Sequence, residues 1–368
     1  MIYNQLFDFL KDIEVKIARF LRNDTMNTHL KPDDIYTGAT SYLFRPSKRL
    51  RPAVLLMSCG SVNDSIDESV VIPAAAGVEV FHTWTLVHDD LIDNDSMRRG
   101  KPSVHCEIEA LCQNKLHFNE SHAKEYGRSV AILAGDMMQA WSIKLFASLA
   151  DNGFIDAAVA LKLIMILETE IISNLIYGET LDVRYGYGFH EIEDLLKLKE
   201  DEIINMLWLK TGVLYSFSAM AGAMIGKNIT DDKDPVVSAL KGFASACGTA
   251  FQLQDDILGI TGDEKLLGKP VGSDIREGKK TTILLEALRN ASPQQRNYLS
   301  SVVGNRAAVP EDIEKTKSLL IELNGVDYTK QLARKFIKNA IPHLDIIKES
   351  QYKHLLLLWA NYMIERDF

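Results

Sequence analysis

Apolar residues recur along most of this chain with the spacing of amphipathic helices. In the first segment they occupy positions i, i+3, i+4 and i+7, at Ile2, Leu6, Phe9, Leu10, Ile13, Ile17 and Phe20. Similar spacing predicts helices within 128–150, 154–183, 191–226, 235–260, 310–340 and 345–365. No segment shows the sustained alternation of a half-buried strand. The pattern predicts an all-α fold whose helices are longer than average.

Length and composition favour one domain with a large core. A chain of 368 residues could form two domains by length alone, but its 10 prolines and 22 glycines are dispersed and no linker separates two halves. With 46% apolar residues the chain can bury an extensive core, which excludes a disordered protein. We therefore predict a single domain over residues 1–368.

Charge and cysteine content limit which binding partners and which cellular compartment the protein can have. The net charge of −9 argues against a nucleic-acid-binding surface, because phosphate backbones favour a basic excess. We expect no stretch of about 18 apolar residues that could span a membrane, since the run 161–175 contains Lys162, Glu168 and Glu170. The 4 cysteines are too scattered for a disulfide framework. We predict a cytoplasmic protein without a transmembrane segment.

The stretch 70–102 combines carboxylates with arginines. On a helix, which turns about 100° per residue, Asp89 and Asp93 lie about 40° apart and His82 falls between them two turns earlier. A hard divalent ion such as magnesium would relieve the repulsion between the carboxylates, with waters and phosphate oxygens completing its shell. Arg98 and Arg99 would then bind the same phosphates. The alternative is a solvated acidic helix end followed by a basic loop.

A short basic turn precedes the helix that we expect to begin near Ala53. Residues 45–52 place Lys48, Arg49 and Arg51 between two prolines, which fix the backbone at both ends. Taken alone, this segment is explained by a solvated basic loop. A phosphate-binding role gains weight only from the other charged segments.

A second acidic cluster repeats the arrangement of the first. Gln252 precedes Asp255 by three residues and Asp256 by four, so the amide and both carboxylates project from neighbouring positions. A loop rich in glycine and proline follows, with charges at Lys265, Lys269, Asp274, Arg276, Lys279 and Lys280. Two such clusters facing each other across an apolar cavity would hold a diphosphate between metal ions. A solvated loop explains one cluster easily and two poorly.

Two further segments carry charges that are ordinary when taken alone. Glu179 and Asp182 lie near the end of a predicted helix, and Lys210 with Thr211 follows another. Between residues 102 and 131, the side chains His105, Cys106, Cys112, His117 and His122 could bind zinc, but their spacing matches none of the usual zinc pairs. We expect a surface insertion near 104–127 instead.

Five ordered motifs resemble those of the trans-isoprenyl diphosphate synthases, and most closely those of archaeal-type geranylgeranyl diphosphate synthases. They are KRLRP at 48–52, HTWTLVHDDLIDNDSMRRGKP at 82–102, GETLD at 178–182, KTG at 210–212 and FQLQDDILGITGDEKLLGKPVGSDI at 251–275. A DDxxD motif alone is a weak signal, but five motifs in order between about residues 40 and 285 are specific.

The resemblance implies an isoprenoid-synthase helical bundle around a deep central cavity, usually a homodimer. It implies a magnesium-dependent prenyltransferase that joins isopentenyl diphosphate to an allylic diphosphate. Magnesium ligands are expected at Asp89, Asp93 and Asp255, with further catalytic roles for Lys210 and Lys269. Allylic diphosphate binding is expected from Arg98, Lys210, Thr211, Gln252, Lys269 and Lys279, and isopentenyl diphosphate binding from Lys48, Arg51, His82 and Arg99.

The chain departs from the family pattern at four places. Pro46 and Ser47 stand where a Gly-Gly pair is usual before KRLRP, and Glu179 stands where glutamine is common. Gly259 takes the last position of the second DDxxD, so that motif must work with Asp255 and Asp256. The connection around 106–126 is also longer than usual.

Bulk on the helix before Asp89 is expected to set the product length. Phe81 lies about 80° from Asp89 around the helix and Trp84 about 140°, which favours Phe81 as the cavity floor. In the family, however, the fifth residue before the motif, here Trp84, often limits chain length. A tryptophan there suggests a C15 to C20 product, with geranylgeranyl diphosphate favoured. The alternative is an aromatic stripe that only packs the core.

Other functions stay open at this point. A longer-chain polyprenyl diphosphate synthase would share every motif. A non-catalytic subunit of a heteromeric synthase would be expected to lose one acidic cluster or the basic turn, and this chain keeps both. A class I terpene cyclase has no use for a second diphosphate site, and a helical scaffold would explain the apolar spacing but not the charged clusters.

Overall fold

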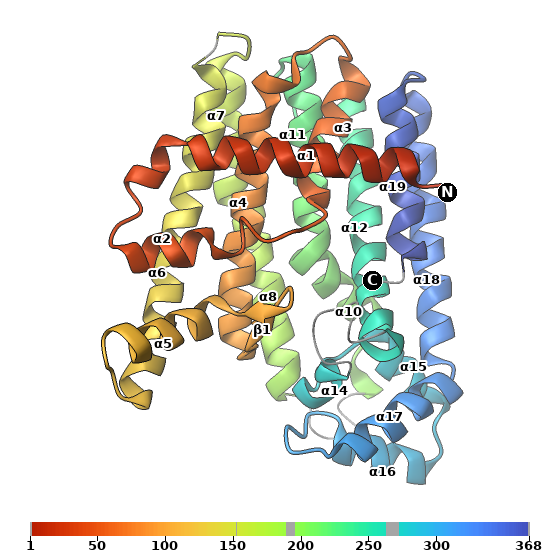
Figure 1. Cartoon of the computed structure of the whole chain (residues 1–368). Coiled ribbons are helices and arrows are strands. Elements are labelled where there is room, and N and C mark those ends of the chain that lie inside the picture. The colour runs from red at the N-terminus through yellow and green to blue at the C-terminus, as the bar shows by residue number, and fades with distance from the viewer. Residues whose placement is uncertain (1, 152, 189–195, 263–271, 367–368) are drawn as a thin grey trace. The chain divides into compact units, whose positions relative to one another are not determined.

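Helices form nearly all of the regular structure in the parts of the chain that the computed structural model describes, residues 2–151, 153–188, 196–262 and 272–366 (Figure 1). The predicted all-α fold is confirmed. The chain divides into two compact units. The first unit contains Met1–Ile166, Ser218–Val237 and Lys348–Leu355, and the second contains Leu167–Phe217, Ser238–Ile347 and Leu356–Phe368. The single domain over 1–368 stays a prediction.

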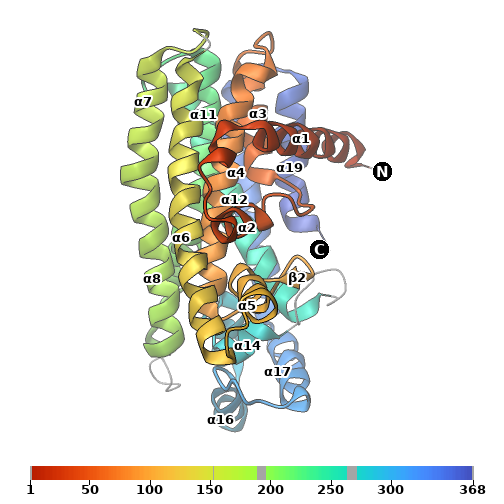
Figure 2. The same cartoon turned by 60° about the vertical axis from the view of Figure 1, so that its left-hand side comes forward.

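The first unit is built around α4 and α6, which pack side by side along much of their length (Figures 1 and 2). Helix α1 crosses α3 and α4, and α5 folds back onto α6. The elements are α1 (Asn4–Asn23), η1 (Thr25–Thr28), α2 (Asp33–Ser41), α3 (Leu50–Val62), α4 (Glu68–Asp93), β1 (Met97–Arg98), β2 (Lys101–Pro102), α5 (Val104–Lys115), α6 (Glu120–Ala147), η2 (Ser148–Ala150) and α7 (Ala157–Ile166).

The sequence of α4 defines both of its ends. The side chain of Asp67 accepts a hydrogen bond from the Ser69 amide, which caps the first turn. The helix stops at Asn94, which adopts the left-handed conformation with φ 59°. Near this end α6 approaches closely, because a Cβ on Gly135 would lie 2.1 Å from Nε2 of His88. Glycine at 135 therefore allows α6 to support the end of α4 that carries the acidic motif.

Helix α1 buries one apolar stripe that contains the predicted Leu6, Leu10, Ile13 and Ile17 and also Leu21. The predicted Phe9 and Phe20 are half-buried, and Ile2 is 81% exposed. Tyr352, from the late segment of the first unit, packs on α3. Its ring leaves no room for a side chain at Gly60, where a Cβ would lie 2.6 Å away. The same ring meets Phe9 of α1 edge-on, with the ring centroids 6.4 Å apart. The late segment thus completes the packing of the first helices.

The predicted loop after α4 contains a small antiparallel hairpin, in which β1 pairs with β2. Its two turn residues, Arg99 and Gly100, have φ angles of 53° and 72°. Positive φ at both central residues is the geometry of tight hairpin turns, and glycine favours it. The hairpin fixes the backbone of the two arginines, Arg98 and Arg99. The segment 104–127 then forms α5 and the start of α6, and its status as an insertion stays a prediction.

The second unit contains α8, α10 and the helices after α12, with two π-helical turns. Its elements are η3 (Leu167–Ile171), α8 (Ile172–Gly188), α10 (Glu200–Leu207), η4 (Trp208–Gly212), α14 (Ser273–Glu277), α15 (Thr282–Asn290), α16 (Pro293–Val302), α17 (Pro310–Glu322), α18 (Gly325–Ala340) and η5 (Ile341–Ile346). Three helices contribute residues to both units: α11 (Val213–Lys227), α12 (Pro235–Thr261) and α19 (Gln351–Glu365).

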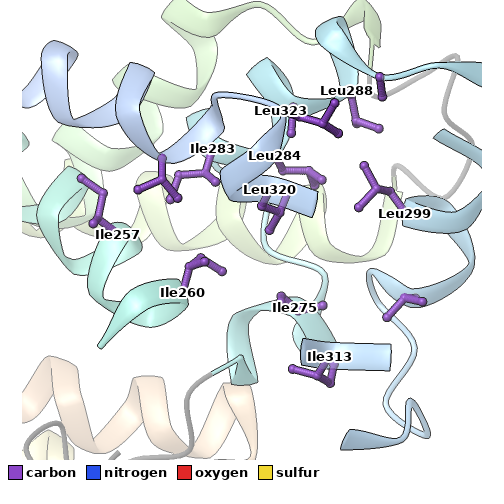
Figure 3. Packing of buried hydrophobic residues seen from close by; sticks show 14 of the residues in the cluster. Ile257, Ile260, Ile275, Ile283, Leu284, Leu288, Leu299, Ile313, Leu320 and Leu323 are labelled. Carbon is purple, nitrogen blue, oxygen red and sulfur yellow. The ribbon is translucent and has the colours of Figure 1, made fainter. Parts of the chain in front are cut away.

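An apolar cluster holds the second acidic segment in place within this unit (Figure 3). Ile257 and Ile260 of α12 pack with Ile275 of α14, and the other members come from α15 to α18. Because Ile257 follows Asp256 directly, burial of this isoleucine orients the end of α12 that carries the carboxylates. Burying an isoleucine contributes about 2 kcal/mol, so the cluster anchors this turn firmly.

Two helices have the length and composition of membrane spans, Glu68–Asp93 and Glu120–Ala150, whereas the sequence led us to expect none. In the structure, 78% of the most apolar 18-residue stretch of the first helix is buried, and 50% of the corresponding stretch of the second helix is buried. Core helices of water-soluble folds share these properties with membrane spans. The two helices are therefore weak indicators of a membrane.

Candidate active site

Helix α4 carries the residues of the first acidic motif without interruption. His82, Asp89 and Asp93 all lie within Glu68–Asp93, so the predicted common helix is present. The Asp89 side chain is 22% exposed, and a terminal nitrogen of Arg98 lies 3.6 Å from its Oδ2 atom. Asp89 can therefore be reached from water and lies beside a cation, and Asp93 is half-buried. Their roles as metal ligands stay predictions.

Asp90, between those two aspartates in sequence, has a different environment. Its side chain is fully buried and accepts hydrogen bonds from the Tyr42 hydroxyl and from Arg98, whose Nε lies 2.8 Å away. Tyr42 also accepts a hydrogen bond of 3.0 Å from the Val104 amide. Burial raises the pKa of Asp90, although Arg98 and Tyr42 oppose the shift. Asp90 therefore anchors Arg98, a role that sequence reasoning missed.

The charged side chains of the basic turn before α3 differ in burial. Arg49 is buried, forms an ion pair with buried Glu79 of α4, and donates to the Leu43 carbonyl oxygen. It adopts the left-handed conformation with φ 47°, which this ion pair helps to maintain. Lys48 is only half-buried. Arg49 is thus structural, which agrees with its absence from the predicted substrate ligands.

Positive charge is concentrated around His82. Nη1 of Arg51 lies 2.9 Å from Nε2 of His82. Burial, together with Arg51, Arg99 and Arg98, holds the pKa of His82 well below its usual value. Burial also lowers the pKa of Arg99 to about 10, and Arg49 and Arg98 contribute to this shift. A neutral His82 accepts from Arg51, and the surrounding guanidinium groups favour a bound anion.

The two aromatic residues predicted to limit product length lie in contact on α4. Phe81 is fully buried, and its ring meets Trp84 edge-on with the centroids 5.0 Å apart. Trp84 in turn meets the ring of His88 at 5.7 Å. The indole nitrogen of Trp84 is buried and has no hydrogen-bond acceptor among the described residues. Both aromatic residues can act as steric bulk, and their effect on product length stays a prediction.

In the second unit, a π-helical turn presents Lys210 to α8. Such turns are rare and occur often at functional sites. Nζ of Lys210 lies 2.9 Å from Oε2 of Glu179 and 2.6 Å from Oδ2 of Asp182. Helix α8 can approach this turn closely because Gly178 has no side chain. A Cβ at this position would lie 2.5 Å from the backbone nitrogen of Lys210. The structure therefore brings together the segments 178–182 and 210–212, whose charges looked ordinary in the sequence when each was taken alone.

A hydrogen-bonded chain links the next residue, Thr211, to the second acidic motif. The Thr211 hydroxyl donates to Oε1 of Gln252 at 2.8 Å, and Nε2 of Gln252 donates to Oδ1 of Asp256 at 3.3 Å. Burial and then the charge of Asp274 raise the pKa of Asp256 well above its usual range. Asp256 is buried and already accepts the hydrogen bond from Gln252, whereas its neighbour Asp255 is 39% exposed and can be reached from water.

Asp255 forms an ion pair with Arg366, a residue that sequence reasoning did not single out. No sequence signal pointed to this pair, because 111 residues separate the two. Lys279, a predicted diphosphate ligand, lies 3.2 Å from Glu277 and 3.9 Å from Asp274. Lys269, the remaining predicted ligand, lies outside the described residues. That the two acidic clusters face each other stays a prediction.

The available donors suit magnesium better than zinc. Within the described ranges, no group of three or more His, Cys, Asp or Glu side chains is arranged to hold a metal ion. Magnesium commonly takes one or two carboxylates and completes its shell with waters and phosphate oxygens, so it does not need such a group. Partly exposed Asp89 and Asp255 can supply those carboxylates. The residues present therefore fit magnesium together with a diphosphate.

Comparison with known proteins places these features in a family. A model of the polyprenyl synthetase family matches residues 33–320. A geranylgeranyl diphosphate synthase of Saccharolobus solfataricus is 38% identical over 98% of this chain and 96% of that protein. A geranylfarnesyl diphosphate synthase of Aeropyrum pernix is 29% identical over 92% of this chain and 96% of that protein.

A solved structure agrees with the sequence comparisons. The geranylgeranyl pyrophosphate synthase of Corynebacterium glutamicum, complexed with isoprenyl diphosphate and magnesium, is similar with a TM-score of 0.83. It is 28% identical, and the similarity covers 98% of this chain and 99% of that one. The helical fold, the ordered motifs and these matches agree, and the chain belongs to the polyprenyl synthetase family.

Proposed function

We propose that this protein is a head-to-tail prenyltransferase that condenses isopentenyl diphosphate with an allylic diphosphate to give a C15 to C20 product, with geranylgeranyl diphosphate favoured. The observation that carries this proposal is the concentration of guanidinium groups around neutral His82, on the helix that presents Asp89 and Asp93. The similarity to geranylgeranyl diphosphate synthases supports the product class.

The first unit would supply a metal site, the binding site for isopentenyl diphosphate and one ligand of the allylic diphosphate. Asp89 and Asp93 would hold magnesium, and Arg98 would bind the allylic diphosphate beside it. Isopentenyl diphosphate would be bound by Lys48, Arg51, His82 and Arg99. Because His82 is neutral, it can donate one hydrogen bond to a phosphate oxygen while it accepts another from Arg51.

The second unit would bind the allylic diphosphate and a further metal ion. Asp255 is the proposed metal ligand, and Lys210, Thr211, Gln252, Lys269 and Lys279 are the proposed diphosphate ligands. In the structure the Lys210 ammonium is paired with two carboxylates, which hold it in position. A diphosphate carries more charge density than either carboxylate and can compete for this ammonium.

The reaction begins when the bond between the allylic carbon and its diphosphate oxygen breaks. Magnesium, when bound, would neutralise the charge that develops on the departing diphosphate. Arg98 and Lys210 would stabilise the same charge by hydrogen bonds. The double bond of isopentenyl diphosphate then forms the new carbon–carbon bond, and loss of a proton, which we assign to the released diphosphate, restores an alkene. Apolar helix faces would exclude water from the cation.

Product sizing tests this function directly. The purified chain would be incubated with labelled isopentenyl diphosphate, magnesium and separate C5, C10 or C15 primers. We expect a C20 product from each primer, loss of turnover with chelator, and recovery when magnesium is added back. The variants Asp89→Asn and Asp93→Asn should be folded but inactive.

Each other outcome rejects part of the proposal. Products of C25 or more would identify a longer-chain synthase, the activity named for the Aeropyrum pernix relative. No incorporation by a correctly folded protein would support a non-catalytic subunit. Full turnover by Asp89→Asn would exclude this carboxylate as a metal ligand.

We also propose that the protein acts as a cytoplasmic homodimer. Helices α6 and α7 of the first unit expose large apolar side chains at Ile132, Leu133, Leu161 and Met165. Large apolar side chains exposed on two packed helices favour burial in a protein interface. Light scattering should give twice the chain mass, and Leu133→Glu combined with Leu161→Glu should give a monomer. Val309→Glu, at an exposed apolar residue elsewhere, is the matched control.

A further inference from the structure

Arg366 is held tightly against the second acidic motif within the second unit. Its side chain is only 7% exposed and pairs with Asp255. The same guanidinium donates to the Phe251 carbonyl oxygen at 3.1 Å and lies 3.9 Å from the centroid of the Phe251 ring. In addition, Nε2 of Gln254 donates to the backbone oxygen of Arg366 at 3.0 Å. Four separate contacts therefore place this arginine on α12.

The ion pair occupies an oxygen that the proposed chemistry needs. A terminal nitrogen of Arg366 contacts Oδ1 of Asp255, the carboxylate proposed as a metal ligand. A guanidinium and a divalent cation repel each other and compete for the same carboxylate. Asp255 is 39% exposed, so a metal ion can approach it from water while Arg366 lies on the buried side.

We propose that Arg366 is a positioning residue that serves as the counter-ion of Asp255 when no metal is bound, and that metal binding at Asp255 detaches it. This inference rests on the proposed metal role of Asp255. Without metal, Arg366 neutralises the Asp255 carboxylate, and this ion pair keeps the chain just after α19 attached to the surface of α12. With metal, that attachment loses its principal charge partner, so occupancy of the site is coupled to the position of Arg366.

The coupling has a definite sign. If Arg366 must leave before the metal binds, its contacts subtract from the observed metal affinity. Removing the arginine should therefore tighten metal binding at Asp255. A partly exposed ion pair combined with a cation–π contact corresponds to an effect of about tenfold. Lysine keeps the charge but loses the planar fork that reaches Phe251, so Arg366→Lys should give an intermediate affinity.

Calorimetric titration with Mg²⁺ in the absence of substrate measures this effect. The titration uses the Asp89→Asn, Asp93→Asn double variant, so that binding at the first cluster does not contribute. In this background we compare Arg366, Arg366→Gln, Arg366→Lys and Asp255→Asn. The control is Arg296→Gln, because Arg296 of the same unit donates to the carbonyl oxygens of Leu288 and Arg289. The control should leave the affinity unchanged.

Hydrogen exchange separates displacement from simple repulsion. The Arg366 amide donates to the Tyr362 carbonyl oxygen at 3.3 Å and should exchange faster when Mg²⁺ is added. In Arg366→Gln and in Asp255→Asn, exchange of the peptide that contains this amide should be fast with or without metal. Tighter binding without any metal-dependent exchange would show that Arg366 stays in place, which rejects the proposed detachment.

The outcomes distinguish this inference from the function on which it rests. If Asp255→Asn binds Mg²⁺ as well as the parent, Asp255 is not a metal ligand and the proposed function must change. If Asp255→Asn loses binding while Arg366→Gln and Arg366→Lys match the parent, the metal role stands and the counter-ion role of Arg366 is wrong. If Arg366→Gln does not fold, Arg366→Lys and the exchange measurement on the parent still decide.

Discussion

Replacing Asp90 by alanine should destabilise the fold, whereas the same change at Asp93 should affect mainly activity. The two aspartates belong to one motif, but Asp90 is fully buried and accepts hydrogen bonds from Tyr42 and Arg98. Asp93 is half-buried in the last turn of α4. The family resemblance implied a metal role for Asp93 and none for Asp90, and the structure now gives Asp90 a structural role.

The expected magnitude follows from the groups that Asp90→Ala leaves behind. The buried Tyr42 hydroxyl would lose its acceptor, which costs about 1–3 kcal/mol. A fully buried arginine without its partner would cost about 3–5 kcal/mol. Arg98 is 23% exposed, however, and has Asp89 and Asp95 at 3.6 and 3.7 Å, which offset part of the loss. We expect a destabilisation of about 3 kcal/mol in total.

Urea denaturation followed by far-UV circular dichroism measures this difference at neutral pH. Asp90→Ala should unfold at clearly lower urea concentration, while Asp93→Ala should change the free energy of unfolding by about 0.5 kcal/mol or less. Asp93→Ala should nevertheless lose prenyl transfer. Equal midpoints for the two variants, or a greater loss of stability for Asp93→Ala, would refute the assignment of Asp90 as the structural member of the motif.

Three further predictions concern separate sites. Glu79→Ala should cost about 3–5 kcal/mol in denaturation, because it leaves the buried charge of Arg49 without a partner, whereas Asp12→Ala in an exposed pair should not. Burial lowers the pKa of Lys280 from 10.5 to about 8, so the unfolded chain binds more protons between these values and stability should rise with pH from about 8 to 10.5. Lys280→Met should remove that rise and stabilise the protein at pH 7 by at most about 3 kcal/mol, which denaturation at several pH values would show. Phe81→Ala or Trp84→Ala should lengthen the product, and Trp84→Phe should not, because bulk rather than the indole nitrogen is proposed to set length; unchanged products from both alanine variants would reject this.

The long elements could be predicted from the sequence because their apolar spacing extends over several turns. Helix α4 is predicted together with the shared position of Asp89 and Asp93, and α12 matches its predicted range almost residue for residue. The short helices Asp33–Ser41, Thr282–Asn290 and Pro293–Val302 were not predicted, because 9 or 10 residues provide too few repeats. The hairpin at Arg99 was also missed, since each of its strands contains 2 residues.

Residue types at the candidate site could be predicted, but their partners could not. The pairing of Tyr42 with Asp90 joins residues 48 positions apart, and that of Arg366 with Asp255 joins residues 111 apart. Such contacts depend on how helices pack, which local spacing does not contain. The sequence likewise indicates a charged Lys210, but only the π-helical turn shows which carboxylates hold it.

The packing of Tyr352 against Gly60 and Phe9 has a consequence for how the protein is made. The first unit cannot complete its core until the ribosome has synthesised residues 348–355, although its first helices emerge much earlier. During that interval the nascent chain exposes the faces of α1 and α3 that Tyr352 later covers. Chaperones that recognise apolar surface should therefore bind the nascent chain until this tyrosine has emerged from the ribosome and packed.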